Sequence, residues 1–363
     1  MDQRPPSRDD YTVACICARY NELATVTGMF DEKFDHPSQL LHQIAYRFGR
    51  IGPHKVVVVQ LPEVGTNKAA AAVTQLKNEF RSVLFALSVG IGGGIPNATN
   101  QCDIRLGDIV VSRPMERLPG VVQYDLGRSF GNRFLLEALY EQQGSKVKDY
   151  MEMMLKKHTA MRPKYDYPGT QHDLLFRANY EHRGPYSDCN NCDQSKQVKR
   201  DPRPNSNPVI HYGNIGSANT VMMNATGREH LKENYEVLCV EMEAGRIMDV
   251  MPCLVVRGVA DYTDSHKNER WQNYAAAAAA GFMKEFLLCI PGQGIIEQFE
   301  VEREKFTSSF SELWDALLSA AEDQNAKEIV CILDAIGDCE DHGRSQLVNA
   351  LYKSYSNKRD FNL

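Results

Sequence analysis

The strand-like segment Lys55–Leu61 (KVVVVQL), with an uninterrupted run of four β-branched valines, constrains the fold of this chain more than any other feature. A strand without a polar face must be covered on both sides, as happens inside parallel or mixed sheets. A second apolar run, Tyr11–Ala18, is interpreted as another buried strand. Helices from the same chain must supply the cover. The sequence therefore predicts an α/β fold with a central mixed sheet flanked by helices.

Strand and helix patterns alternate along the chain up to about residue 292, which predicts one domain over residues 10–292. Further strands are predicted at Val83–Val89, Asp108–Ser112, Val209–Ser217, Val237–Val240 and Leu254–Val259. Helices are predicted at Asn67–Phe80, Phe134–His158, Glu243–Val250 and Trp271–Ile290, and Asn21–Phe30 is the start of a helix or a loop.

Two segments break this alternation. Residues 162–208 carry six prolines among polar residues, which predicts an irregular insertion rather than a domain. Residues 293–363 open with a charged stretch and continue with a helical pattern and an apolar strand, Glu328–Leu333. We expect this segment to be a short C-terminal α/β appendage.

Composition argues against two classes of partner. A formal net charge of −6 disfavours binding to nucleic acid or to an anionic membrane surface. No run of about 18 apolar residues is present, and the N-terminal residues do not resemble a signal peptide. The ten cysteines are scattered, as reduced thiols of the cytosol are. We expect a cytoplasmic or nuclear protein that binds neither nucleic acid nor a membrane.

Three motifs follow predicted strands, where open α/β sheets place their ligands. The first is GIGGGIP, in which Gly90, Gly92 and Gly93 would let backbone amides approach a ribose, a base or a phosphate. A tight loop without a ligand is an equal alternative. The motif is neither a Walker A loop nor a full dinucleotide fingerprint, so we expect no cofactor.

The other two motifs place carboxylates at strand ends. Glu241 and Glu243 flank Met242 between a predicted strand and a helix, and buried carboxylates in such a place need partners. Sugar hydroxyls are natural partners for at least one of them. Asp261 closes the strand Leu254–Val259, where a carboxyl group can exchange a proton with a base nitrogen. The alternative for each acidic residue is a helix cap.

The order of these motifs, preceded by Ala18–Glu22 (ARYNE), resembles the purine nucleoside phosphorylase and nucleosidase superfamily. The hydrolytic methylthioadenosine/S-adenosylhomocysteine nucleosidases are the most similar members, and Leu106–Val111 resembles a further strand motif of this superfamily. The resemblance implies a nucleoside phosphorylase-type fold, a purine nucleoside or nucleotide substrate with adenine favoured, and a homo-oligomer.

The resemblance also implies a role for each motif residue. Glu22 matches the carboxylate that activates the attacking water, and Met242 and Glu243 match the residues that hold the ribose. Asp261 matches the acid that protonates purine N7, so that the base leaves as a neutral species. An acid with this role needs a raised pKa, and we expect apolar neighbours around Asp261 to supply it.

Departures from the family pattern bear on the nucleophile and the base. Ile91 stands where phosphate-using relatives have serine, and Ser88 stands near a phosphate-binding arginine of some of them. Water is therefore favoured over inorganic phosphate, with phosphorolysis as the alternative. Asn219 and Val221 replace an aspartate and an aromatic residue that lie under the base, so base stacking stays open.

The insertion contains a pair of cysteines with the spacing of a zinc knuckle. Cys189 and Cys192 follow His172 and His182, but no second cysteine pair comes after them. Free thiols and no bound metal are therefore expected, with a structural metal as the alternative.

The tail adds a second resemblance. Glu328–Asp338 resembles the Walker B strand of fungal NACHT-type NTPases, which carry phosphorylase-like domains at the N-terminus. The chain has no P-loop, so we expect no NTPase activity. The resemblance makes ATP a candidate substrate, with Arg19 and Arg113 nearest to its phosphates by motif position. A silent nucleotide-sensing module is the alternative of a different class.

Overall fold

A computed structural model of the chain describes residues 6–34, 44–96, 102–113, 120–124, 128–131, 145–183 and 188–290. The chain divides into two units, Met1–Gly292 and Gln293–Leu363, and all described residues belong to the first. The Walker B-like strand predicted at Glu328–Asp338 lies outside the described residues.

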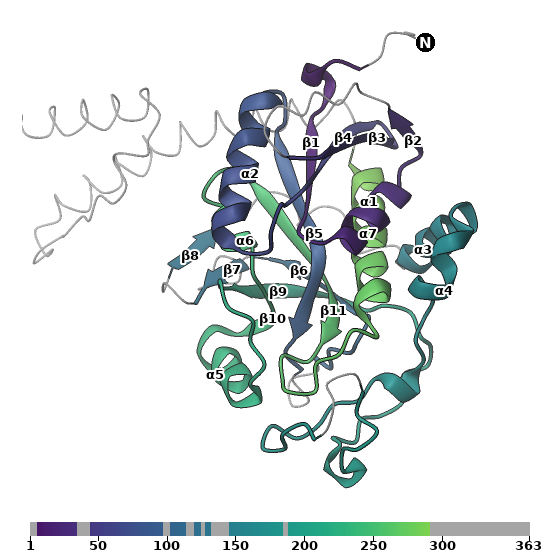
Figure 1. Ribbon diagram of the computed structural model, residues 1–363, viewed down its shortest axis with the longest axis vertical. Coiled ribbons are helices and arrows are strands. Elements are labelled where there is room, and N and C mark those ends of the chain that lie inside the picture. Colours follow the sequence, from purple (N-terminus) through teal and green to yellow (C-terminus); the bar gives the residue numbers. More distant parts are fainter. Residues whose placement is uncertain are drawn as a thin grey trace, which may run out of the picture. The chain divides into compact units, whose positions relative to one another are not determined.

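One mixed sheet forms the centre of the first unit (Figure 1). Its strands run in the order β2-β3-β4-β1-β5-β11-β6-β9-β7-β8, and β10 pairs with both β5 and β9. The strands are β1 Val13–Cys17, β2 Glu32–Phe34, β3 Tyr46–Ile51, β4 His54–Gln60, β5 Phe85–Gly94, β6 Ile109–Ser112, β7 Gly120–Gln123, β8 Arg128–Gly131, β9 Ile210–Ser217, β10 Val237–Glu241 and β11 Cys253–Asp261. Strands β4, β1, β5 and β11 run parallel to one another, whereas β6 is antiparallel to β11. The predicted α/β fold with a central mixed sheet is confirmed.

Helices cover both faces of this sheet. They are α1 Tyr20–Gly28, α2 Thr66–Glu79, α3 Val147–Lys157, α4 Arg162–Tyr165, α5 Ala225–Tyr235, α6 Ala244–Ile247 and α7 Gln272–Cys289. Successive residues of a strand point to opposite faces. In β1, Ala14 and Ile16 belong to the core cluster that includes Val73 of α2, whereas Cys15 contacts Met283 of α7. Figure 1 accordingly shows α2 and α7 on opposite sides of β1 and β5.

The glycine motif is part of a strand, so the expectation that it forms a loop behind Val83–Val89 is wrong. β5 continues to Gly94 because it pairs with β11 on one side and with β10 on the other. Glycine is required here by close packing rather than by a turn. A Cβ atom on Gly90 would lie 2.6 Å from Glu22 Oε1, and one on Gly92 would overlap Cys239 Sγ.

The helix predicted at Glu243–Val250 is the short α6, which ends at Ile247. Of the helix predicted at Phe134–His158, α3 begins at Val147, and residues 134–144 lie outside the described part of the chain. The pattern did not predict α5, nor the strands β2, β3, β7 and β8. Within the described residues, no helix combines the length and the apolar character needed to cross a membrane.

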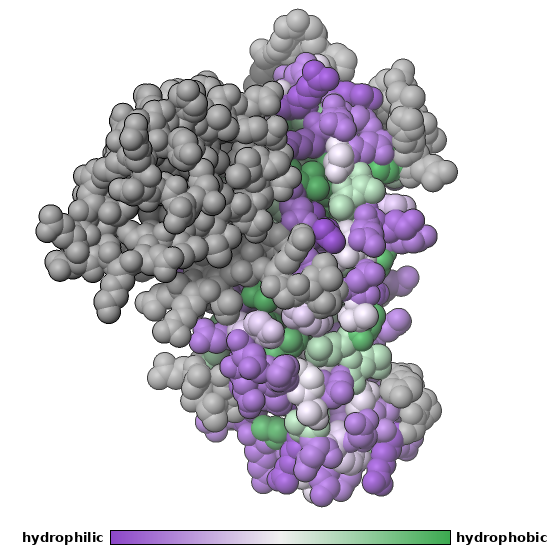
Figure 2. Space-filling view, turned by 90° about the vertical axis from the view of Figure 1, so that its left-hand side faces the viewer, coloured by the Kyte–Doolittle hydropathy of each residue, from purple (hydrophilic) through white to green (hydrophobic). Residues whose placement is uncertain are grey.

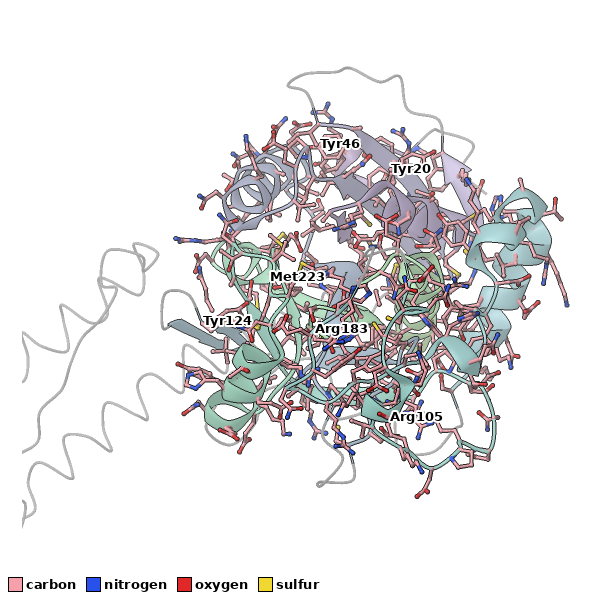
Figure 3. The ribbon with its side chains drawn as sticks, turned by 60° about the horizontal axis from the view of Figure 1, so that its bottom comes forward. Tyr20, Tyr46, Arg105, Tyr124, Arg183 and Met223 are labelled. Carbon is pink, nitrogen blue, oxygen red and sulfur yellow. The ribbon has the colours of Figure 1, made fainter. Side chains whose placement is uncertain are left out.

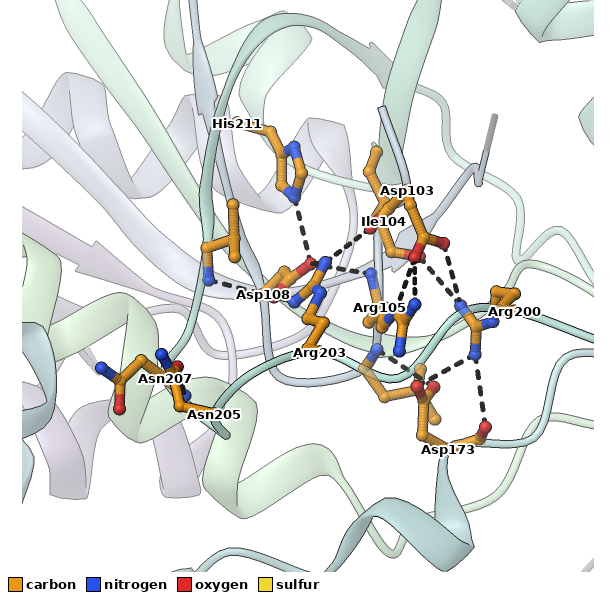
Figure 4. Close-up of polar contacts among 12 residues, drawn as sticks. Asp103, Ile104, Arg105, Asp108, Asp173, Arg200, Arg203, Asn205, Asn207 and His211 are labelled. Carbon is orange, nitrogen blue, oxygen red and sulfur yellow. Dashed lines mark hydrogen bonds and ion pairs between the residues drawn. The ribbon is translucent and has the colours of Figure 1, made fainter. Parts of the chain in front are cut away.

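The described residues of the insertion have little regular structure, and ion pairs attach them to the sheet. These residues contain α4, two 3₁₀ turns and an isolated bridge between Phe176 and Gln197. Arg200 lies 2.9 Å from Asp173 and stacks over Tyr262, while Arg203 reaches Asp108 (Figure 4).

Asp108 is the centre of this attachment. The Arg203 guanidinium donates to both of its oxygens, at 2.5 and 2.7 Å, and His211 Nε2 lies 3.0 Å from Oδ2. The backbone amides of Arg105 and Val209 donate at 2.8 and 3.0 Å. Burial acts to raise the pKa of Asp108, but the bonds from His211 and Arg203 outweigh it and lower the pKa. Burial acts to lower the pKa of His211, yet the bond to Asp108 raises it to about 9.

Candidate functional site

A cleft with about 600 Å³ of empty space lies where β1, β10 and β11 end beside the glycine-rich half of β5. Figure 3 views the molecule with this lower end turned forward, and Tyr124 and Met223 lie on one side of it. Most residues predicted for the site line the cleft: Arg19, Glu22, Ile91, Gly92, Gly93, Val221, Glu241, Met242, Glu243 and Asp261. Segments far apart in the sequence thus supply one site.

Three predicted residues do not line the cleft. Gly90 lies behind it, against the Glu22 carboxylate. Asn219 is exposed, and its side-chain oxygen accepts a bond of 3.3 Å from the Thr66 amide. Arg113 is exposed at the end of β6, so Arg19 is the one of the two predicted phosphate ligands that lines the cleft.

Glu22 is held in place by backbone amides from two elements. As the third residue of α1, it accepts bonds of 2.8 Å from the amides of Ala18 and Arg19, which also cap the helix. The Ile91 amide of β5 donates to its other oxygen at 2.9 Å. Because Oε1 accepts only this one bond of those described, it retains a lone pair for a ligand or a water molecule.

Glu241 is occupied by the protein itself. Its carboxylate accepts bonds of 3.0 and 2.9 Å from the amides of Glu243 and Ala244 and pairs with Arg257 at 2.6 Å. Arg257 also donates to the carbonyl and hydroxyl oxygens of Ser88, at 3.1 and 2.9 Å. Both charged side chains are almost fully buried, where a charge is tolerated only when paired. Glu241 therefore shapes the site rather than offering it an acceptor.

Glu243 is the carboxylate left open to a ligand. It is 5% exposed, and among the described residues its Oε1 has no hydrogen-bond partner. Oε2 lies 3.6 Å from Arg257 Nη2. Burial, and next the negative charge of Glu241, raise the pKa of Glu243 to about 8. A buried acceptor without a partner at the wall of a cleft is typical of a ligand-binding position.

Asp261 has a charged neighbour, so the expectation of purely apolar surroundings is wrong. Lys267 Nζ lies 2.9 Å from Oδ2, and the Thr263 amide donates to Oδ1 at 2.9 Å. Thr263 adopts a positive φ of 57°, which costs about 1–3 kcal/mol for a residue other than glycine. Its hydroxyl group donates to the Gly94 carbonyl at 3.3 Å, which helps to hold this turn and with it the carboxylate.

Several residues of the site carry no clear functional signal in the sequence. Arg257 interrupts the apolar run LVVRGVA, and a charge in such a strand signals a buried ion pair. Lys267 lies in the polar loop after β11, where no pattern distinguishes it from its neighbours. The cleft is also lined by Val64, Tyr124, Thr220, Met222, Val240 and Gln272. The lining thus combines apolar side chains with carboxylates, which suits a flat ring attached to a hydroxylated group.

Comparison with known proteins assigns this chain to a family. Residues 12–288 match the sequence profile of the phosphorylase superfamily. A nucleotide-binding leucine-rich repeat (NLR)-like protein of Hyaloscypha variabilis is 37% identical over 301 residues. That match covers 78% of this chain but 29% of the relative, so the chain spans less than a third of the relative's length.

Solved structures with a similar fold include two nucleosidases. One is the S-adenosylhomocysteine nucleosidase of Streptococcus pyogenes in complex with 5-methylthiotubericidin, at 18% identity and a TM-score of 0.48 over 78% of this chain and 98% of that one. The other is the 5′-methylthioadenosine/S-adenosylhomocysteine nucleosidase of S. pneumoniae, at 19% identity and a TM-score of 0.48 over 77% and 100%. The sequence profile, which covers most of the described unit, confirms the family expected from the motifs. This chain belongs to the phosphorylase superfamily.

Proposed function

We propose that this chain hydrolyses the N-glycosidic bond of a purine nucleoside or nucleotide, with adenine as the favoured base. One observation carries the proposal: a buried carboxylate oxygen of Glu243 lacks a partner among the described residues and lines a cleft shared with Glu22 and Asp261. A ribose offers the two hydroxyl donors that such an acceptor requires. The family match over residues 12–288 supports the same reading.

Each acidic residue then has one task. Glu243 accepts hydrogen bonds from the ribose hydroxyls, and Met242 packs beside the sugar. As the bond between C1′ and N9 breaks, its electron pair passes to the base, and Asp261 transfers a proton to N7. Glu22 takes a proton from the water molecule that adds to C1′. The products are free base and ribose, or a ribose phosphate when the substrate is a nucleotide.

Lys267 is a proton source for Asp261 in this mechanism. In the structure its ammonium group lies 2.9 Å from Asp261 Oδ2. This contact offers a route by which an ammonium proton reaches the carboxylate as negative charge develops on the leaving base. The acid in this proposal is therefore the pair of Asp261 and Lys267 rather than a carboxyl group isolated among apolar side chains.

Hydrolysis is favoured over phosphorolysis because most cationic side chains near the cleft are already paired with groups of the protein. The Arg257 guanidinium is paired with Glu241 and bonded to Ser88, and the Ile91 amide is bonded to Glu22. Among described residues that line the cleft, Arg19 and Lys267 are the cations, and Lys267 is paired with Asp261. An inorganic phosphate would find few donors, whereas Arg19 remains available to a 5′-phosphate.

A substrate panel tests this function. We expect release of free base from at least one of adenosine, AMP, ATP and methylthioadenosine, at a rate that does not change when inorganic phosphate is added. Inosine and guanosine serve as base controls, and chromatography of the base and sugar products gives the readout. Strict dependence on phosphate, with ribose 1-phosphate as product, would contradict hydrolysis. Nucleotide binding without any base release would favour a sensing module.

The raised pKa of Glu243 predicts a pH dependence of substrate affinity. Ribose hydroxyls bind the carboxylate, which predominates only above pH 8 because burial and Glu241 raise its pKa to about 8. We expect KM for the preferred nucleoside to fall as the pH rises from 7 to 9, by up to about 10-fold per pH unit below the pKa. The Glu243→Gln variant should show a higher KM with no such fall. A parent KM that is constant over this range would contradict the assignment.

The homo-oligomer expected from the resemblance stays a prediction. Val64 and Val221, which line the cleft, are 40% and 55% exposed, and the nearby Met223 is 41% exposed. These are apolar side chains that a second copy would cover. On the face shown in Figure 2, the coloured surface is mostly hydrophilic, and apolar side chains form small separate patches.

A further inference from the structure

Three side chains of the insertion, which did not form a convincing metal-binding pattern in the sequence, lie close together in the structure. Within the described residues, one ligand atom each of His182, Cys189 and Cys192 lie within 4.8 Å of one another. Beside them lies a second cavity with about 570 Å³ of empty space, lined in part by Asp188, Cys189 and His266. None of the three clustered side chains takes part in the function proposed above.

The tautomer of His182 suits a metal ligand. Its Nε2 lies 2.8 Å from the Asp188 carbonyl oxygen, which can only accept a hydrogen bond. Nε2 therefore carries the proton, and Nδ1 of the neutral ring keeps its lone pair. Metal-binding histidines typically donate their other ring N–H to a carbonyl or carboxylate in this way, which orients the ring and raises its basicity.

His266 approaches the cluster from the loop after β11. It is 6% exposed, and neither ring nitrogen has a hydrogen-bond partner among the described residues, although Nδ1 lies 3.6 Å from Asp264 Oδ1. Its ring stacks on Phe176, with centroids 4.2 Å apart, and its centroid lies 5.4 Å from that of His182. Burying two unbonded ring nitrogens is unfavourable unless a further group binds one of them.

Cys189 and Cys192 have different surroundings from the buried cysteines of the central sheet. Cys15, Cys17, Cys239 and Cys253 lie in central strands, where strand pairing and apolar neighbours account for their burial. Cys189 and Cys192 instead form a small apolar cluster with Phe176, in a segment nearly devoid of regular structure. Clusters of this size rarely order a segment without a disulfide or a metal ion.

We propose that His182, Cys189 and Cys192 bind a zinc ion, and that the ring of His266, which lies outside their 4.8 Å cluster, moves closer to supply the fourth ligand. Two thiolates and two imidazoles form a tetrahedral set typical of structural zinc, and two thiolates balance the charge of Zn²⁺ within a buried cluster. The ion joins the insertion to the loop after β11, where the His182 amide already donates to Ser265 Oγ at 3.0 Å. That loop also carries Lys267, so the metal holds the partner of Asp261 in place.

Metal analysis of the full chain tests the site without relying on activity. The reduced protein, purified without chelators, should contain about one zinc per chain by mass spectrometry of the metal. The Cys189→Ser and Cys192→Ser variants should lose it, whereas Cys289→Ser, at an exposed cysteine, should retain it. Absence of zinc from the parent even after incubation with excess Zn²⁺, or retention of zinc by the double Cys189→Ser/Cys192→Ser variant, would overturn the proposal.

Cobalt substitution tests the site in the parent protein, so the result does not depend on whether the cysteine variants fold. Co²⁺ bound to the parent protein should give a thiolate-to-cobalt charge-transfer band and the intense visible bands of tetrahedral coordination. Octahedral bands without charge transfer, or a Cys189–Cys192 disulfide that persists when the protein is purified under reducing conditions, would overturn the site. The His266→Gln variant should bind zinc at least about 10-fold more weakly. Unchanged affinity would remove His266 from the ligand set.

Discussion

Replacing Asp261 by asparagine is expected to slow the release of base by about 10²–10⁴-fold. The side chain ends β11, is 7% exposed, and is oriented by Thr263 and Lys267. An amide has nearly the same shape but cannot pass a proton to N7, so the base would have to leave as an anion. The effect should therefore appear in kcat, with only a small change in KM.

Two comparisons separate this chemical role from a structural one. Nitrophenyl riboside, whose leaving group departs without protonation, should lose far less activity in Asp261→Asn than a purine nucleoside does. Asp249→Asn, which alters an aspartate outside the cleft lining that pairs with Arg246, should behave like the parent. If Asp261→Asn released purine base at the parental rate, the acid assignment would fail.

Replacing Asp108 by alanine is expected to lower the free energy of unfolding by about 3–5 kcal/mol. The carboxylate is buried and accepts bonds from Arg203, His211 and two backbone amides. Its loss would leave a guanidinium, an imidazole and two N–H groups without their partner. Denaturant unfolding should show a lower midpoint with an unchanged slope.

A surface pair provides the control for this variant. Asp166 pairs with Arg162 at 3.3 Å, but both side chains are well exposed, so Asp166→Ala should change stability by less than about 1 kcal/mol. A change of that small size in Asp108→Ala would contradict the central role of the carboxylate.

The difference between Asp108→Ala and the parent should also depend on pH. The folded-state pKa of Asp108 is lowered, so its contribution is present above the ordinary pKa of 3.8 and is lost as the pH falls through the lowered value. The pKa of His211 is raised from 6.5 to about 9, so its contribution is complete below pH 6.5 and is lost as the pH rises through 9. The difference should therefore be largest between about pH 4 and 6.5.

The central strands could be predicted because burial on both faces leaves a plain apolar pattern. Val56–Val59 of β4 and Val255–Val256 of β11 are fully buried, as their runs predicted. β3 was missed because arginines interrupt YRFGRI, and α5 because it buries only two side chains. The glycine motif was misjudged as a loop because glycine has a low β-propensity, which strand pairing on both sides overrides here.

The residues of the site were easier to predict from the sequence than the hydrogen bonds and ion pairs that they form. Glu22, Glu243 and Asp261 each follow a recognisable motif at a strand end, and all three line the cleft. It was not predictable that the protein itself would occupy the Glu241 carboxylate, because Arg257 reaches it from β11, a strand that does not pair with β10 in the sheet. Lys267 approaches Asp261 from an irregular loop, where no periodicity reports the direction of a side chain.

The missing side chain of Gly90 has an evolutionary meaning. Because a methyl group there would lie 2.6 Å from Glu22 Oε1, alanine at this position would force the carboxylate to shift. A duplicated gene copy that kept all three acids but acquired alanine here would read as intact in any motif search. Its Glu22 carboxylate, to which the proposed function assigns the activation of water, would nevertheless be displaced, so this glycine marks whether a paralogue has kept the geometry of the site.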